Sequence, residues 1–211
     1  MQIVFLFYDG MTALDAIGPY EVLSRLPGAV TRIAALKAGP IKTCSSLNLL
    51  ADSSLAEIDH ADLLVVPGAG NATNLQKFPN ILEWIRTIHS TTTWTASVCT
   101  GSLILGASGL LSGHPATTHW AVMDRLAAYG AIAQHARVVF SGKMVTAAGV
   151  SAGIDMALTL AARIAGDSVA QALQLGLEYD PEPPFNTGSV SKASPALVEG
   201  LRSRLMTRFI D

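Results

Sequence analysis

Short, continuously apolar runs bounded by turn residues alternate with segments of helical period along this chain, and that alternation limits the folds open to it. Runs of this length are typical of strands covered on both faces, as in a parallel sheet. They lie at Ile3–Tyr8, Leu63–Val66, Trp94–Val98, Val138–Phe140 and Met144–Ala148. Apolar residues at helical spacing follow Pro79, a favoured first helical residue, and Ser151, a favoured N-cap. The pattern predicts an α/β fold.

Composition narrows the class of protein further. The 211 residues are 50% hydrophobic and 14% charged, with a formal net charge of −2. These values favour one compact domain over residues 1–211 and exclude a disordered or fibrous chain. No run of like charges offers a surface for nucleic acid or an anionic membrane, so the expected ligand is a small molecule.

Targeting signals and cysteine usage point to the cytoplasm. No apolar stretch approaches the roughly 20 residues that span a bilayer. The opening ten residues lack the basic region and cleavage site of a signal peptide, and they are interpreted as a first strand. The two cysteines, Cys44 and Cys99, suit a reducing compartment, so a cytoplasmic location is expected.

The C-terminal part of the chain contains one abrupt change of composition. The segment 180–195 holds four prolines, which exclude a helix or a central strand there. It is predicted to be an extended surface arm, packed across the sheet or on a neighbouring subunit, or else loose. Further helices are expected at about 18–26, 100–108, 118–129, 168–178 and 195–209.

The most informative stretch for function is 93–113, in which an apolar strand runs into Cys99 and then into a helix opened by Thr100, Gly101 and Ser102. This is the sequence form of a nucleophile elbow, in which small residues let the backbone turn sharply. We expect the Cys99 side chain to be pushed into an exposed, strained position at the carboxyl edge of the sheet. The adjacent helix N-terminus would stabilise a thiolate and donate to a charge on a substrate. The alternative is a buried core cysteine, which is the interpretation favoured for Cys44.

Five segments together resemble a known family. They are YDGMTALDAIGPYEVLSRL, DLLVVPGAGN, SVCTGSLILGASGLL, ATTHW and AAGVSAGIDMAL, spread in order over about residues 1–180. They resemble the ThiJ/PfpI superfamily, and within it most closely the isonitrile hydratase branch, which is also shared by the amidase-like domains of some AraC-type regulators. The resemblance implies a class I glutamine amidotransferase-like fold, a three-layer α/β sandwich around a flavodoxin-like, mostly parallel sheet. It also implies a homodimer.

The resemblance implies that an acid faces the cysteine and handles the proton, and here that residue is Asp15. A carboxyl group near a thiolate is pushed toward its protonated form, which makes it a proton donor at neutral pH. Asp15 could equally be the N-cap of a helix beginning at Gly18. Many superfamily members use a Glu beside the cysteine, so Glu21 is the second candidate.

Backbone donors near the cysteine are expected from two places. Thr100 would present its N–H, and its hydroxyl as well, beside the reacting carbon, although a first-turn Thr also caps helices. The turn that contains Gly68 and Ala69 resembles the family's Pro-Gly-Gly turn, whose N–H groups complete an anion hole. Ala69 stands where a second Gly is usual, and a donor survives there only if the residue needs no positive φ.

A histidine, His119, lies where many superfamily members carry one. A hydrogen bond to Cys99 would make a Cys–His dyad as in hydrolases, while the alternative is a structural role beside Trp120. The other histidines lack metal-ligand spacing, so no metal is expected. The glycine-rich turns lack the dinucleotide frame, so no cofactor is expected either.

The reaction that the resemblance implies is hydration of a small organic isocyanide to an N-substituted formamide through a Cys99 thioimidate, with water as the second reactant. Two other functions remain open from the sequence. One is a redox or stress sensor, or a regulatory domain, in which Cys99 is oxidised. The other is a Cys–His amidase or hydrolase of the same superfamily.

Overall fold

A seven-stranded sheet forms the centre of the molecule, in the strand order β10-β11-β7-β6-β1-β2-β5. The computed structural model describes residues 1–70 and 78–210. The strands are β1 (Gln2–Leu6), β2 (Val30–Ala35), β5 (Ser53–Ser54), β6 (Leu63–Val66), β7 (Trp94–Val98), β10 (Val138–Ser141) and β11 (Met144–Ala147). All neighbouring pairs are parallel except β10 with β11, which pair antiparallel. The predicted mostly parallel sheet is confirmed.

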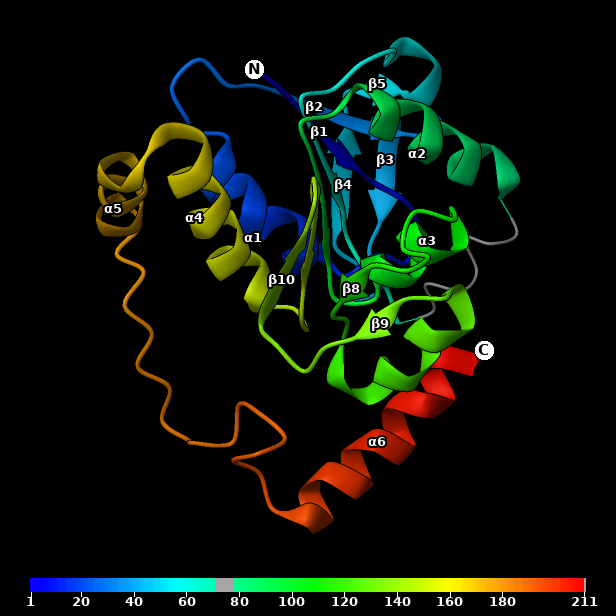
Figure 1. Cartoon of the computed structure of the whole chain (residues 1–211), viewed down its shortest axis with the longest axis vertical. Helices are drawn as coiled ribbons and strands as arrows, with labels where there is room; N and C mark the ends of the chain where they lie inside the picture. Colours follow the sequence, from blue (N-terminus) through cyan, green and yellow to red (C-terminus); the bar gives the residue numbers. More distant parts are fainter. Residues whose placement is uncertain (71–77, 211) are drawn as a thin grey trace.

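Helices cover both faces of this sheet (Figure 1). One layer contains α1 (Ala13–Leu23), α4 (Ala152–Ala165) and α5 (Asp167–Gly176), while α2 (Pro79–Thr91) and α3 (Gly101–Ala107) lie on the opposite side. The central strands are buried from both directions, and all four residues of β6 are fully buried. This two-sided burial explains why the strands are continuous apolar runs and do not alternate.

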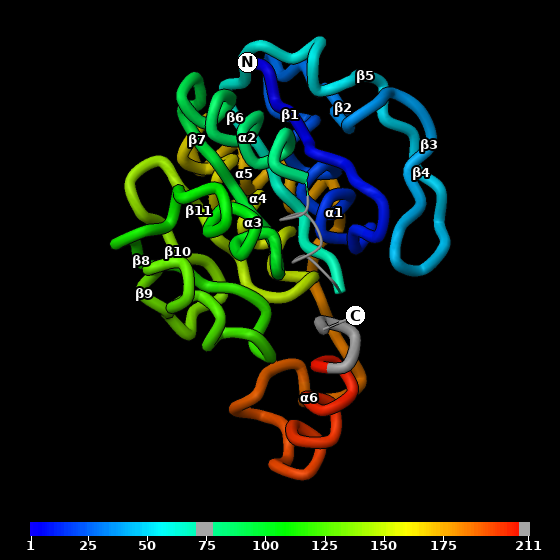
Figure 2. Tube along the Cα trace, turned by 90° about the vertical axis from the view of Figure 1, so that its right-hand side faces the viewer, coloured from blue at the N-terminus to red at the C-terminus, as the bar shows by residue number. Residues whose placement is uncertain are grey.

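Smaller elements surround the sandwich. They are the hairpin of β3 (Gly39–Lys42) and β4 (Asn48–Ala51), the short pair β8 (Pro115–Ala116) and β9 (Ile132–Ala133), and the 3-10 helices η1 (Leu55–Glu57) and η3 (Trp120–Tyr129). Cys44 is exposed in the turn of the β3–β4 hairpin, which lies at the periphery of the molecule (Figure 2). In the described part of the chain, no helix is both long and apolar enough to cross a membrane.

Two helix predictions differ from the structure. The first helix begins at Ala13 and not near residue 18, and it contains Pro19. Proline disfavours helix interiors, yet α1 begins five residues before Gly18 and continues through Pro19. The second difference is η3, a 3-10 helix with a non-helical residue at Val122 in place of the α-helix expected at 118–129.

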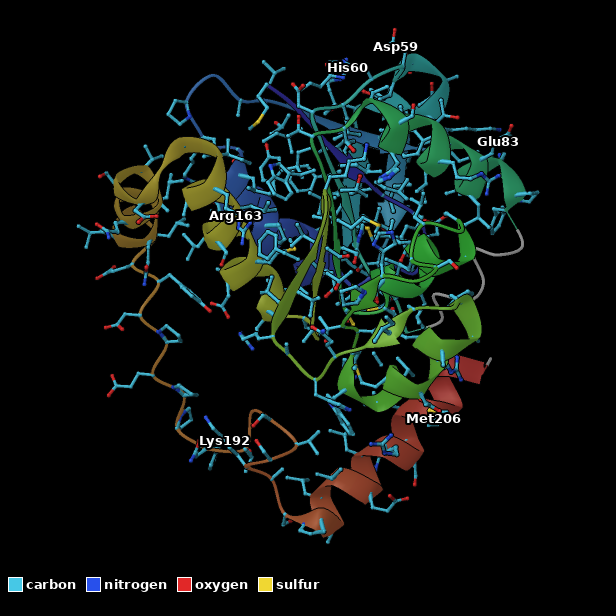
Figure 3. The ribbon with its side chains drawn as sticks, in the orientation of Figure 1. Asp59, His60, Glu83, Arg163, Lys192 and Met206 are labelled. Atoms are coloured by element: carbon cyan, nitrogen blue, oxygen red, sulfur yellow. The ribbon has the colours of Figure 1, made fainter. Side chains whose placement is uncertain are left out.

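The segment 180–194 has neither helix nor strand and is exposed almost throughout, and α6 (Pro195–Ile210) follows it. The arm stands apart from the sheet, so within this chain it does not pack across the sheet as one alternative expected (Figures 1 and 2). Lys192 marks the arm in Figure 3, far from Arg163 on α4. The α6 helix returns to η3, where the Arg202 guanidinium lies 5.2 Å from the Trp120 ring centroid.

Candidate active site

The turn from β7 into α3 places Cys99 at a left-handed backbone position, with φ of 58°. Its N–H donates to the carbonyls of Ala147 and Ala148, both at 3.1 Å, which ties the elbow to the end of β11. Only glycine fits at position 101, because a Cβ there would lie 2.2 Å from the Val66 carbonyl oxygen. A non-glycine residue at positive φ is costly, and such strain is commonly found at functional sites. The backbone of the predicted elbow is therefore present.

The Cys99 side chain is not exposed as the elbow pattern predicts. Cys99 is 4% exposed, and it lies in a site bounded by the segment 147–150 and by α1. Burial and the neighbouring Asp15 carboxyl raise the pKa of the thiol, and the N–H groups of Thr100 and Val150 lower it by a smaller amount. The expectation of a thiolate at rest is thus wrong, because the helix N-terminus does not outweigh desolvation.

Asp15 lies in the first turn of α1 and is completely buried. Its Oδ2 accepts a hydrogen bond from the Gly68 N–H at 3.0 Å, and its Oδ1 has no hydrogen-bond partner among the described residues. The alternative role as N-cap is excluded, because Thr12 holds that position and the Asp15 N–H donates to the Thr12 carbonyl. The sequence interpretation placed Asp15 in a loop because it began the helix five residues too late.

Burial is the main cause of the altered acidity of Asp15. It raises the pKa of the carboxyl from 3.8 to about 7, against the lowering effects of the Gly68 N–H and of the Cys99 side chain. Near neutral pH the carboxyl is therefore close to half protonated, whereas the thiol is neutral. Because it lies in contact with the thiol, the Asp15 carboxyl can both accept and donate a proton near neutral pH, which is the property that acid–base catalysis requires.

The turn 67–70 connects α1 to the elbow. The Gly68 carbonyl accepts from the Thr12 N–H at 2.8 Å, and the Gly68 N–H donates to Asp15. A Cβ at Gly68 would lie 2.6 Å from both the backbone nitrogen and Oγ1 of Thr100 and 2.9 Å from Asp15 Oδ2. Ala69 is not at positive φ, so alanine is compatible with the turn. The predicted PGAGN turn ends at Asn71, which lies outside the described residues.

The N–H groups of Gly68 and Ala69 both have partners within the protein. The Ala69 N–H donates to Thr100 Oγ1 at 2.9 Å, and that hydroxyl donates back to the Ala69 carbonyl at 2.7 Å. Thr100 makes no side-chain cap hydrogen bond to α3, so its hydroxyl fixes the turn and does not cap the helix. Gly68 and Ala69 thus hold Asp15 and Thr100. The backbone N–H groups that act on the sulfur are those of Thr100 and Val150.

The two remaining candidate site residues from the sequence are His119 and Glu21. His119 is the N-cap of η3, where its Nδ1 accepts from the Ala121 N–H at 3.3 Å and its ring lies 5.6 Å from that of Trp120. Burial lowers its pKa. The structure gives Glu21 an ion pair with Arg25 at 2.6 Å, both about half exposed.

Two residues at the site were not singled out from the sequence. Val150 has a φ of 39° and presents its N–H to the Cys99 sulfur. Its only sequence signal is its place in AAGVSAG, whose small residues permit close backbone approach. Tyr8 is 6% exposed and donates its hydroxyl to the Pro67 carbonyl at 2.8 Å. Its position at the carboxyl end of the first predicted strand, on the same sheet edge as Cys99, was the available signal.

Groups of three or more His, Cys, Asp or Glu side chains that could hold a metal ion are absent from the described part of the chain. The groups that the site brings together are the Cys99 thiol, the Asp15 carboxyl and the backbone N–H groups of Thr100 and Val150. This set can add a nucleophile to a small electrophile and supply the proton that the addition needs.

The chain is similar to known proteins over nearly its full length. The model of the DJ-1/PfpI family matches residues 1–163, a range that includes Asp15, the 67–70 turn and Cys99. An isonitrile hydratase from Pseudomonas putida is 41% identical over 204 residues, which are 97% of this chain and 90% of that protein.

Two solved structures resemble the fold. The crystal structure of a ThiJ/PfpI family protein from Pseudomonas syringae has a TM-score of 0.93 and 37% identity, and it covers 99% of this chain and 86% of its own. Drosophila melanogaster DJ-1beta has a TM-score of 0.75 at 24% identity, over 84% of this chain and 97% of its own, and shares the fold.

Proposed function

The chain belongs to the DJ-1/PfpI family, and we propose that it is an isonitrile hydratase, which adds water to a small organic isocyanide to give an N-substituted formamide. It is homologous to an isonitrile hydratase over nearly its full length. The observation that carries the proposal is the buried Cys99 thiol in contact with a carboxyl whose pKa is about 7. A nucleophile and a proton carrier thus share one closed site.

The first half of the proposed reaction forms a thioimidate. The Cys99 sulfur attacks the terminal carbon of R–N≡C while its proton passes to the Asp15 carboxylate. The carboxyl then delivers that proton to the same carbon, giving R–N=CH–S–Cys99. An Asp15 pKa near 7 suits both transfers, because a general acid–base works best when its pKa is close to the operating pH.

The second half releases the product. Water attacks the thioimidate carbon, and the Asp15 carboxylate takes one of the water protons and passes it to the nitrogen, while the other proton stays on the new hydroxyl until it is transferred to sulfur. The C–S bond then breaks, the sulfur recovers its proton, and the formamide R–NH–CHO leaves. The Thr100 and Val150 N–H groups would stabilise the negative charge that develops on sulfur in both halves. Neither half requires a cofactor or an oxidant.

The geometry favours this reaction over the two alternatives. A redox sensor depends on an accessible thiolate, whereas burial keeps the Cys99 thiol neutral. A Cys–His hydrolase would need the imidazole to act on the sulfur. Burial, Asp15 and the N–H groups of Thr100 and Val150 set the pKa of Cys99, and the Nδ1 of His119 accepts a hydrogen bond from the Ala121 N–H.

The proposal is tested with p-nitrophenyl isocyanide by following formamide absorbance. Turnover should be abolished in Cys99→Ala and strongly reduced in Asp15→Asn. The matched control is Cys44→Ala, which removes the exposed thiol and should retain activity. Turnover that survives in Cys99→Ala would exclude the proposed nucleophile. A wild-type protein without turnover that gains oxygen mass at Cys99 in mild peroxide would favour the sensor.

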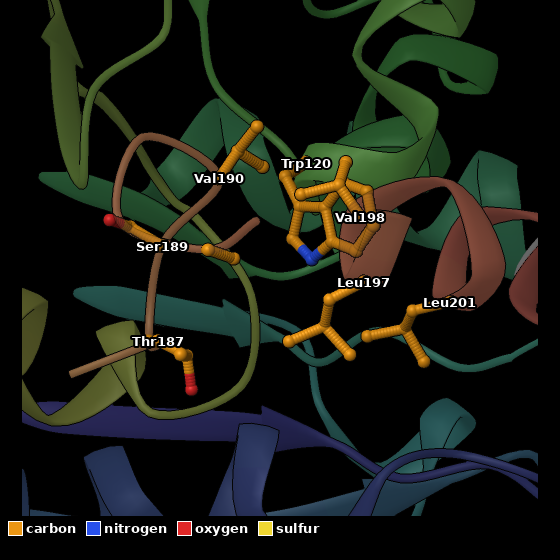
Figure 4. Close-up of a pocket in the computed structure, with 9 residues that line it drawn as sticks. Trp120, Thr187, Ser189, Val190, Leu197, Val198 and Leu201 are labelled. Carbon is orange, nitrogen blue, oxygen red and sulfur yellow. The ribbon is translucent and has the colours of Figure 1, made fainter. Parts of the chain in front are cut away.

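We further propose a homodimer, in the cytoplasm. Apolar side chains are exposed on the arm and α6, with Phe185 77% exposed and Leu201 42% exposed. A cavity of about 110 Å³ lies between the arm, α6 and Trp120 (Figure 4). Exposed apolar groups of this kind support an interface with a second copy. Light scattering should give twice the chain mass of 22.1 kDa, and a monomer at micromolar concentration would contradict the proposal.

A further inference from the structure

One peptide unit of the 67–70 turn is hydrogen-bonded at both ends inside the site. Its carbonyl, from Pro67, accepts from the Tyr8 hydroxyl at 2.8 Å. Its N–H, from Gly68, donates to Asp15 Oδ2 at 3.0 Å. The chain of contacts therefore runs from a phenol through a planar amide to the carboxyl that lies against Cys99.

We propose that Tyr8 is a positioning residue for the reaction: through the Pro67–Gly68 peptide unit, its hydroxyl orients and strengthens the hydrogen bond that holds the Asp15 carboxyl beside Cys99. Its relevance to turnover rests on the proposed function. The hydrogen-bond chain itself does not, because it consists of contacts between residues of this protein.

Polarisation of the Pro67–Gly68 amide is the first physical reason to expect that Tyr8 affects Asp15. A donor on an amide carbonyl draws electron density toward oxygen and makes the N–H of the same amide a stronger donor. Hydrogen-bonded chains in a low-dielectric interior reinforce one another in this way, by about 10–30% per bond. Both hydrogen bonds are buried, so water does not dilute the effect.

The close packing around Gly68 is the second physical reason to expect that Tyr8 affects Asp15. Gly68 lies so close to Thr100 and Asp15 that even a Cβ would meet them at 2.6 to 2.9 Å. A small rotation of this peptide plane would therefore misdirect its N–H. Two donors from the segment between β1 and α1 hold the turn in place. They are the Tyr8 hydroxyl and the Thr12 N–H, which donates to the Gly68 carbonyl at 2.8 Å.

Tyr8 is suited to act as a permanent donor. Burial, followed by the nearby Asp15 and the thiols of Cys99 and Cys44, raises its pKa well above 10. The phenol therefore keeps its proton throughout the working pH range. The Gly68 N–H is in turn a group that lowers the pKa of Asp15. Weakening it should make Asp15 a weaker acid.

The test compares Tyr8→Phe with the protein that retains Tyr8. Both proteins carry Cys44→Ser, so that Cys99 is their remaining thiol. The matched control is Tyr20→Phe. Tyr20 lies on α1 with its ring 5.4 Å from that of Phe5, and it takes no part in the turn. Both substitutions remove one oxygen atom and preserve the ring, and circular dichroism verifies that each variant is folded.

The first readout is the rate of Cys99 alkylation by iodoacetamide as a function of pH, followed by intact mass. It reports the first proton lost from the Asp15–Cys99 pair, whose titrations are coupled. The second readout is the carboxyl carbon shift of Asp15 in a ¹³C-aspartate-labelled protein, assigned by its loss in Asp15→Asn. Neither readout depends on an isocyanide.

In Tyr8→Phe we expect both midpoints to move upward by about 0.3–1 pH unit, and Tyr20→Phe to stay within about 0.1 unit. Turnover should follow the same shift, with the loss greatest at low pH and small on the alkaline side. A merely structural role would lower activity equally at all pH values. A shift of less than about 0.2 unit, a downward shift, or an equal shift in Tyr20→Phe would overturn the inference.

The two proposals fail separately. If wild-type protein does not turn over isocyanide but the midpoints shift as expected, the proposed function fails and the positioning role stands. If isocyanide is turned over and the midpoints do not move, the positioning role fails and the proposed function stands.

Discussion

Replacing Asp15 by Asn should make the protein more stable at alkaline pH while strongly reducing its activity. A buried acid whose pKa is raised favours the protonated form in the folded state. The stability it contributes is therefore greatest at low pH and is lost as pH rises toward the folded pKa. For Asp15 this interval runs from 3.8 to about 7.

The magnitude follows from that shift. Three pKa units correspond to about 4 kcal/mol at 1.36 kcal/mol per unit, the full cost of ionising Asp15 in the folded protein. Because part of the loss already occurs at pH 4.5, the difference between pH 4.5 and pH 8 is about 3 kcal/mol. Asn cannot ionise, so this cost disappears. A buried amide donor without a partner costs about 1–3 kcal/mol, and that penalty does not depend on pH.

The measurement is the free energy of unfolding in urea, for wild type and Asp15→Asn at both pH values. Taking the difference between the two proteins, and then between the two pH values, cancels the penalty of the amide and the titration of distant groups. The expected result is a relative gain of about 3 kcal/mol for Asp15→Asn at pH 8. The control is Asp59→Asn at an exposed surface position (Figure 3), where no such gain is expected. A relative gain below about 1 kcal/mol would refute the assignment of a raised pKa to burial.

Two further substitutions test the turn and a histidine remote from the site. Gly68→Ala forces a Cβ to within 2.6 Å of Thr100, so it should lower the unfolding free energy by about 1–3 kcal/mol and reduce turnover. Gly70→Ala, where a Cβ meets no atom of the described residues within 4 Å, is its control, and equal losses in urea titrations would contradict the close-packing argument. The pKa of His89 is lowered by burial, then by Lys143 and His114, so the folded state favours its neutral form and stability should fall as pH drops below 6.5. His89→Gln should flatten that dependence between pH 5 and 7, and an unchanged slope of the urea midpoint against pH would count against it.

Local patterns predicted the architecture well because they reflect burial along one chain segment. The apolar run Leu63–Val66 matches β6 at both ends, and Trp94–Val98 matches β7. The place of Cys99 between a strand and a helix was equally readable, since small residues must follow a tight turn. The start of α1 was not, because the Gly18–Pro19 pair locally resembles a helix boundary and the tertiary structure overrides it.

The burial and protonation of Cys99 depend on segments distant in the chain, and local sequence patterns did not predict them. The exposed, ionised Cys99 expected from the elbow became a buried, neutral thiol. The cause is the covering of the site by the segment that contains Val150 and by α1, which lie about fifty and eighty residues away in the chain. No local pattern reports the dielectric environment that such segments create.

The sequence by itself determined the layered α/β fold and the presence of a cysteine and an acid on the same edge of the sheet. It did so because strand order of this kind brings the carboxyl ends of parallel strands together. Only the tertiary structure decided the protonation of that pair and the hydrogen bonds of the Pro67–Gly68 peptide. Both depend on how completely water is excluded and on contacts spanning 53 residues or more in the chain, which spacing along the sequence does not encode.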